Sequence, residues 1–210
     1  MSPDGATVAF VLDRDSSDVW TVPVSGGAPT RITTDRPLAA FWDDGGAVWS
    51  PDGANIAFGG GDLLDSLFQK PASGAGEEKV LLSEPGVIHA PTEYSHDGRF
   101  LLYYSSDATG APLAQFVLPL DGSKKPITLV NPPGFGAGQG RLSPDMRWIA
   151  YVSTESGRRE IYVRPFNANG PSLGDGKWQI SRDGGTLPAW RADGKEIFFR
   201  GPTGIMSAAV

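Results

Sequence analysis

The chain has 210 residues, of which 40% are hydrophobic, and 24 acidic against 18 basic residues give a net charge of −6. Its Lys and Arg residues are scattered, which argues against a nucleic-acid partner, because phosphate binding needs clustered positive charge. The absence of cysteine excludes disulfides, thiolate metal sites and cysteine nucleophiles. No apolar run reaches the roughly 20 residues that cross a bilayer, so we expect no membrane segment in this chain and see no signal peptide.

A short motif recurs along the chain and divides it into repeats. Ser-Pro-Asp-Gly or an altered copy stands at 2–5, 50–53, 95–98, 143–146 and 191–194, at spacings of 48, 45, 48 and 48 residues. A period of about 40–50 residues is typical of a propeller blade of four antiparallel strands. The 28 Gly and 18 Pro residues suit short strands joined by turns. The sequence therefore predicts an all-β protein, a β-propeller of about five repeats in one domain over 1–210.

Each repeat is predicted to hold up to four strands in the same order. Second strands follow the turn at 7–12, 55–60, 100–105, 148–153 and 196–201, and third strands lie at 18–24, 66–71, 114–120, 160–166 and 204–210. Fourth strands are expected at 30–34, 79–83, 126–130 and 177–181, and first strands precede the turn at 47–50, 91–95, 140–143 and 187–191. The count is 18 strands, with an incomplete first and last blade. One hypothesis is a fragment of a six- or seven-bladed propeller whose open blade edges favour self-association; a five-bladed ring is the other.

Each residue of the repeated motif has a structural role in a turn. Pro fixes φ, Asp bonds nearby backbone N–H groups, and Gly takes a positive φ, so the recurring acids are predicted to be structural: Asp4, Asp52, Asp97, Asp145 and Asp193. Met146 replaces the Gly, which predicts strain or a different turn type. Recurring aromatic residues are predicted to pack between neighbouring sheets: Phe10, Phe58, Tyr103, Tyr151 and Phe198 on second strands, and Trp49, Tyr94 and Trp190 before the turns.

These repeats resemble the TolB-type, WD-like β-propeller repeat, whose signature is Trp-Ser-Pro-Asp-Gly followed by Ile-Ala-Phe. The stretches 67–82, 138–166 and 177–199 are most similar to the C-terminal propeller of acidobacterial-type bacterial Ser/Thr protein kinases. In that family a kinase and a membrane helix precede the propeller. The resemblance implies a periplasmic or extracytoplasmic sensor or interaction module, and it brings no catalytic residue with it.

We find no recognisable catalytic or cofactor-binding set. There is no GxSxG motif, and only two histidines, His89 and His96, are present. Prolyl oligopeptidase-like enzymes carry such propellers, but their catalytic Ser lies in a separate hydrolase domain. Asp13, Asp15 and Asp18 form a DxDxxD pattern of oxygen ligands that suits Ca²⁺; the alternative is a solvated hairpin loop in which Asp18 caps the turn.

Binding is expected in the loops at the channel face. The long connections 35–46, 84–92 and 131–140 carry the large or polar candidates Phe41, Trp42, His89 and Phe135. The leading hypothesis is a non-enzymatic module that binds a protein or small molecule there. The alternative is a propeller that serves a hydrolase, or a hydrolase or lyase that works in the channel mouth.

Overall fold

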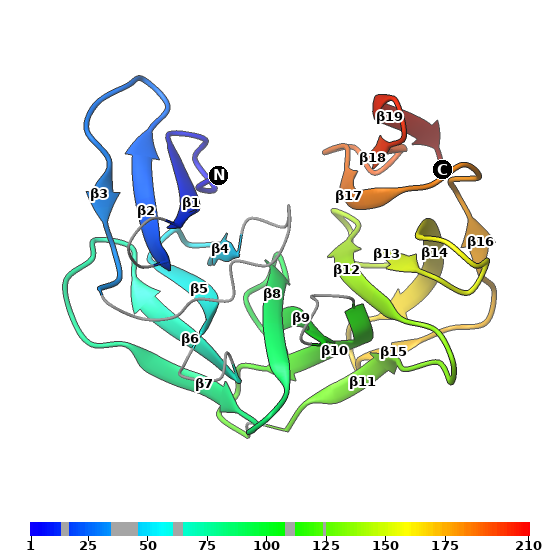
Figure 1. Cartoon of the computed structure of the whole chain (residues 1–210), viewed down its shortest axis with the longest axis horizontal. Helices are drawn as coiled ribbons and strands as arrows, with labels where there is room; N and C mark the ends of the chain where they lie inside the picture. The colour runs from blue at the N-terminus through cyan, green and yellow to red at the C-terminus, as the bar shows by residue number, and fades with distance from the viewer. Residues whose placement is uncertain (14–16, 35–45, 61–64, 108–111, 124) are drawn as a thin grey trace.

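Five small antiparallel sheets make up the protein. The computed structural model describes residues 1–13, 17–34, 46–60, 65–107, 112–123 and 125–210. Within these ranges there are nineteen β-strands, no helix and therefore none that could span a membrane. Figure 1 shows the sheets following one another around an arc, with β1 near one end and β19 near the other. We call the sheets blades 1 to 5 in chain order.

Each blade is built from strands that are neighbours in the sequence. Blade 1 contains β1 (Thr7–Asp13), β2 (Ser17–Pro23) and β3 (Thr30–Arg31). Blade 2 contains β4 (Ala47–Trp49), β5 (Asn55–Gly60), β6 (Ser66–Pro71) and β7 (Lys79–Ser83). Blade 3 contains β8 (Ile88–Tyr94), β9 (Phe100–Ser106), β10 (Pro112–Pro119) and β11 (Ile127–Val130). Blade 4 contains β12 (Ala137–Leu142), β13 (Trp148–Ser153), β14 (Glu160–Asn167), β15 (Ser172–Leu173) and β16 (Trp178–Gln179). Blade 5 contains β17 (Thr186–Trp190), β18 (Glu196–Gly201) and β19 (Gly204–Ala209).

The predicted all-β, five-bladed propeller with three-stranded first and last blades is confirmed. Two details differ. The short strand β15 is an addition to the predicted set, and it pairs with β14 beside β16. The innermost strands β8 and β12 begin three residues earlier than predicted, which turns part of two expected loops into sheet.

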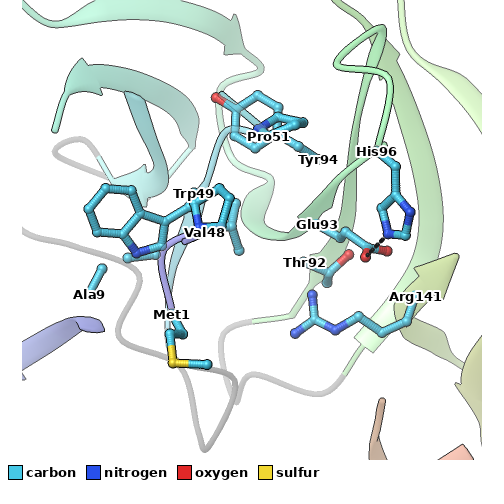
Figure 2. Close-up of a pocket in the computed structure, with 12 residues that line it drawn as sticks. Met1, Ala9, Val48, Trp49, Pro51, Thr92, Glu93, Tyr94, His96 and Arg141 are labelled. Atoms are coloured by element: carbon cyan, nitrogen blue, oxygen red, sulfur yellow. Dashed lines mark ion pairs between the residues drawn. The ribbon is translucent and has the colours of Figure 1, made fainter. Parts of the chain in front are cut away.

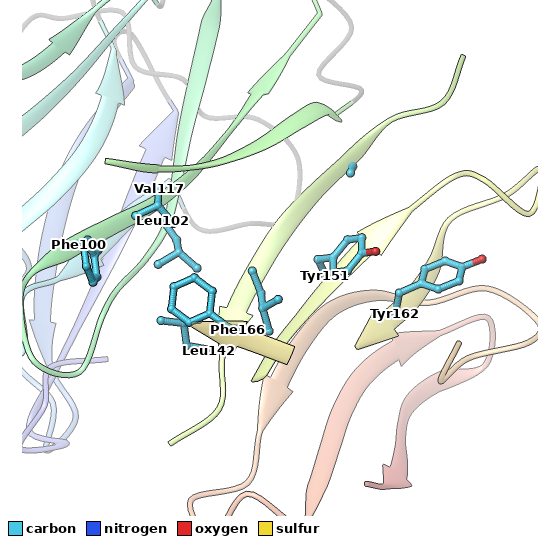
Figure 3. Packing of buried hydrophobic residues seen from close by; sticks show 9 residues of the cluster. Phe100, Leu102, Val117, Leu142, Tyr151, Tyr162 and Phe166 are labelled. Carbon is cyan, nitrogen blue, oxygen red and sulfur yellow. The ribbon is translucent and has the colours of Figure 1, made fainter. Parts of the chain in front are cut away.

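The hydrophobic core lies between the blades and is divided into four clusters, one for each pair of neighbours. Successive side chains of a strand point to opposite faces of its sheet. Leu101 accordingly packs toward blade 2, whereas Leu102 packs toward blade 4. Figure 3 shows the cluster between blades 3 and 4, where Phe166 and Leu142 lie near Leu102. A single blade cannot bury both faces, so its stability depends on its neighbours.

The recurring aromatic positions follow this rule. Phe58, Tyr103 and Tyr151 are at most 1% exposed in the three central blades, as predicted. Phe10 is only half-buried, and Phe198 is 38% exposed, which corrects the prediction for these two residues. The physical reason is that blades 1 and 5 each have a neighbouring sheet on one face only.

The five repeat turns confirm that their Asp residues are structural. In four of them the Ser hydroxyl donates to the Asp carboxylate, over 2.6 Å from Ser2 to Asp4, and in the last the Arg191 guanidinium takes its place. The Ser2 hydroxyl is the main reason why the pKa of Asp4 lies below its ordinary value. Met146 adopts the same turn with φ at 54°, so the strained alternative is the one observed.

Candidate functional site

The innermost strands of blades 3, 4 and 5 share a local irregularity. Each of β8, β12 and β17 contains a β-bulge against its second strand, which falls between Pro91 and Glu93 in β8 and at the equivalent place in the other two. A bulge adds one unpaired residue and turns the side chains beside it in a new direction, which is why bulges recur next to functional sites. Gln139 and Leu187 have a φ of 57° and 56° at these bulges.

Side chains near the bulges tie each inner strand to the next blade. Thr92 donates its hydroxyl to the carbonyl of Gly140 over 2.8 Å, and the Leu142 N–H donates to Oε2 of Glu93 over 2.7 Å. The same pattern links blades 4 and 5, where the Leu187 N–H donates to Oε1 of Gln139 over 2.9 Å. These bonds satisfy backbone groups that lack a strand partner, so the inner strands form a fixed wall.

Residues of blades 1 to 4 line an open cavity of about 610 Å³ along this wall, which we call the axial cavity. Two positions of the repeat line it. One lies two residues before the repeat serine (Val48, Glu93 and Arg141) and the other directly after it (Pro3, Pro51 and His96). Figure 2 shows these side chains together with Trp49 and Tyr94. Within the described ranges, its lining includes only three ionisable side chains besides Tyr94, namely those of Glu93, His96 and Arg141.

Glu93 and His96 form a pair at the cavity wall. Nε2 of His96 lies 3.6 Å from Oε1 of Glu93, and Nδ1 lies 3.1 Å from the Pro144 carbonyl oxygen. A carbonyl only accepts, so Nδ1 carries a proton, and a carboxylate facing Nε2 favours a proton there as well. The hydrogen bond to Glu93 is the main reason why the pKa of His96 is raised above its ordinary value. The pair can therefore hold an imidazolium beside a carboxylate near neutral pH.

Arg141 projects from β12 into the same cavity and is half-buried. Its backbone carbonyl accepts from Nε1 of Trp190 over 3.0 Å, which fixes the strand beneath it. No carboxylate of the described part of the chain forms an ion pair with its guanidinium. A guanidinium presents five donors in a planar fork that suits carboxylates and phosphates.

Two further cavities adjoin the axial cavity. One, of about 440 Å³, lies between blades 2 and 3 and shares Tyr94 and His96 with it. The other, of about 510 Å³, continues toward blade 5 past Trp190 and shares Glu93, His96 and Arg141. His96 lines all three, so the three cavities adjoin one another at this residue.

Asp18 of the predicted calcium pattern has a structural role. It is 1% exposed, and its Oδ1 accepts the Thr33 hydroxyl over 2.8 Å while Arg31 pairs with Oδ2. Asp18 therefore fastens the beginning of β2 to the residues of and after β3. Residues 14–16 of the turn lie outside the described residues, so capping of the turn by Asp18 stays a prediction. Asp15 and the side chain of Asp13 lie outside the described residues, so calcium binding by the three acids stays a prediction.

The structure describes two of the four predicted contact residues, His89 and Phe135. His89 lies inside β8 instead of a loop and is 1% exposed, because the strand begins at Ile88 and turns this side chain into the sheet packing. Phe135 is half-buried in the turn between β11 and β12. Phe41 and Trp42 lie outside the described residues.

Sequence reasoning missed Glu93 and Arg141 as site residues. The available signal was the repeat position two residues before the serine, which reads Val48, Glu93, Arg141 and Ala189 along the chain. The next position is large and hydrophobic in all four blades (Trp49, Tyr94, Leu142 and Trp190). The position before it varies in size and charge, which indicates that packing of the fold does not determine its side chain. In the structure this variable position faces the cavities.

Comparisons with known proteins agree with the fold. No family model matches the chain. The "Uncharacterized protein Atu1656" of Agrobacterium fabrum is 25% identical over 211 residues, which cover 95% of this chain and 67% of that protein. Among solved structures, TolB from Acinetobacter baumannii is 20% identical with a TM-score of 0.72 over 92% of this chain and 46% of that one. A Mycobacterium tuberculosis puromycin-hydrolyzing peptidase is 16% identical with a TM-score of 0.70 over 98% and 35%.

These likenesses show a TolB-like β-propeller fold, which is shared by proteins of different functions. The chain spans less than half of the length of either solved structure named above.

Proposed function

We propose that the chain is a non-enzymatic binding or sensor module of a larger bacterial signalling or envelope protein, and that its ligand occupies the axial cavity. The observation that carries this proposal is the cavity itself. Side chains from four blades line one hollow of about 610 Å³, where apolar and aromatic side chains lie beside polar and charged groups. This combination is characteristic of ligand sites in proteins.

The fixed inner wall supports the same proposal. Glu93 and Thr92 are held by backbone groups of the next blade at 2.7 and 2.8 Å, so the cavity does not need to reorganise when a ligand enters. A preorganised site loses less conformational entropy on binding. The resemblance of the repeats to TolB-type propellers supports an extracytoplasmic location, and similarity of three stretches to kinase-linked propellers supports a signalling role.

An enzymatic role is the second candidate, and the His96–Glu93 pair is the observation that favours it. An imidazole beside a carboxylate can transfer protons, and it lies at the cavity wall. The fold is also shared with a puromycin-hydrolyzing peptidase. On this reading the propeller would serve a hydrolase, or act as a hydrolase or lyase at the channel mouth.

Selection from a random peptide library, followed by mass spectrometry of the bound peptides, tests the two candidates. The binding proposal expects peptides that are recovered intact and whose binding is lost when Val48→Trp fills the cavity. Cleaved or chemically altered peptides would support the enzymatic candidate instead. Binding that survives Val48→Trp would contradict the assignment to the axial cavity. The thermal unfolding temperature of the variant serves as the folding control.

A further inference from the structure

We propose that the axial cavity takes a peptide ligand through a carboxylate group, which the Arg141 guanidinium binds. This inference rests on the proposed binding function and adds the chemistry of the ligand. Two observations support this inference: the charges of the side chains that line the cavity, and the shape of the adjoining hollows.

Among the ionisable side chains that line the axial cavity in the described part of the chain, protonated His96, Arg141 and Glu93 leave one positive charge in excess. When His96 is protonated, its ring at 3.6 Å offsets the negative charge of Glu93, and the other oxygen of Glu93 accepts from the Leu142 N–H. Arg141 lines the same cavity without an ion-pair partner in the described part of the chain. A half-buried guanidinium that lacks an anion is incompletely compensated, because burial weakens its hydration. A carboxylate that enters the cavity supplies the missing charge and accepts two parallel N–H bonds.

The shape of the hollows favours a peptide over a small free anion. The axial cavity is much larger than a carboxylate group, and Trp49, Val48 and Tyr94 give it an aromatic and apolar wall. The adjoining cavities extend it in two directions past His96. An extended chain can reach from the axial cavity into the hollow toward blade 5, placing apolar side chains on the aromatic wall and one acidic side chain at Arg141. The hollow between blades 2 and 3 also presents the Asp52 and Asp97 carboxylates, so an acidic segment does not suit it.

Protonation of His96 should make binding of an acidic peptide depend on pH. The groups that face it are the carboxylate of Glu93, the Pro144 carbonyl, Asp97 in its own turn, and Arg141 across the cavity wall. Protonated His96 offsets Glu93, whereas neutral His96 leaves that carboxylate free to repel an anionic ligand. Binding of an acidic peptide should therefore weaken as pH rises through the titration of His96.

Two matched peptides test the proposal. One is an acetylated and amidated pentapeptide with two glutamates around a phenylalanine, and the other carries glutamines in place of the glutamates. Binding is followed by the indole N–H signals of Trp49 and Trp190 in two-dimensional NMR, because both side chains line the hollows. We expect the acidic peptide to bind at least about tenfold more tightly, as a charge-assisted bidentate pair contributes roughly 1.5–3 kcal/mol.

Arg141→Gln should remove this preference, and Arg141→Lys should restore part of it. The control is Arg147→Gln, which removes the same charge from an exposed position of the same blade outside the hollows. It should leave binding of the acidic peptide unchanged within about twofold. Unfolding temperatures of all three variants establish that they are folded, and the Arg141 side chain has no hydrogen bond in the described structure whose loss would unfold the blade.

Several outcomes would overturn the proposal. If the two peptides bind equally tightly and Val48→Trp abolishes binding of both, recognition of a carboxylate is refuted, but the binding function stands. If Arg141→Gln and Arg147→Gln weaken binding of the acidic peptide equally, the preference reflects only the net charge of the protein. If trigalacturonate binds and the acidic peptide does not, recognition of a carboxylate stands, but the peptide as the ligand is refuted. Absence of binding by every probe would refute the inference, whereas the proposed function would still be judged by the library selection.

Discussion

His89 gives the fold a dependence on pH that can be worked out from its surroundings. The side chain is 1% exposed, and neither ring nitrogen has a hydrogen-bond partner within the described structure. Its ring packs edge-on to Tyr103 at 5.3 Å, and Nε2 lies 3.7 Å from a carboxylate oxygen of Glu84, whose side chain is 57% exposed. Burial lowers the pKa of His89 from 6.5 to about 4, although Asp65 acts in the opposite direction.

The sign follows from the lowered pKa. Above about pH 6.5 His89 is neutral in both the folded and the unfolded chain, and it has no effect on the pH dependence. As pH falls from 6.5 toward 4, the unfolded chain takes up a proton that the folded chain does not, so stability is lost. Each pKa unit corresponds to about 1.4 kcal/mol. The loss through this group should therefore reach about 3 kcal/mol at pH 4.

Urea unfolding of the wild type and His89→Gln at several values between pH 7.5 and pH 4 measures this loss. The difference in free energy of unfolding between the two should change by about 3 kcal/mol over that interval, in favour of the variant at low pH. His96→Gln is a control of opposite sign, because the raised pKa of His96 stabilises the folded chain at low pH and this contribution is lost as pH rises. Parallel curves for the wild type and His89→Gln would refute the reasoning.

Two further predictions concern the backbone and a buried carboxylate. Gly98→Ala should lower the free energy of unfolding by about 1–2 kcal/mol, because Gly98 has a φ of 72° while an added Cβ meets no atom within 4 Å. Gly170→Ala, which is equally open but lacks a positive φ, should not destabilise in the same urea experiment, and an equal loss would contradict the argument. Glu160→Ala should cost about 2–3 kcal/mol in thermal or urea unfolding, since it leaves the buried Ser181 hydroxyl and the Gly184 N–H without their acceptor. Asp183→Ala, whose side chain is 87% exposed in the same network, should stay within about 0.5 kcal/mol, and a comparable loss there would refute the role of burial.

Much of the fold could be predicted because the repeated turn is determined by residues that are close together in the sequence. Ser, Asp and Gly at fixed spacing determine the hairpin between first and second strands by hydrogen bonds and by φ, as Ser2 and Asp4 illustrate. Once the turns are located, the alternation of hydrophobic residues places the second and third strands. The fourth strands were placed less well, since β3 and β16 have only two residues each and depend on pairing with their neighbours.

The site could not be predicted in the same way. Thr92 at the bulge of β8 bonds to Gly140 of the next blade, 48 residues further along the chain, and no local sequence pattern encodes such a contact. The sequence predicts a strand only from residue 91, and it therefore predicts His89 in a surface loop. The importance of Glu93 and Arg141 emerges only when equivalent positions of neighbouring blades face one cavity.

A crystal structure of the protein with the acidic pentapeptide would show directly which part of the protein holds the ligand. We predict a glutamate carboxylate within hydrogen-bond distance of both terminal nitrogens of Arg141, with the phenylalanine against Trp49 or Tyr94. Density for the peptide away from the axial cavity, for example along the exposed strand β19 where Ile205 is 85% exposed, would contradict it.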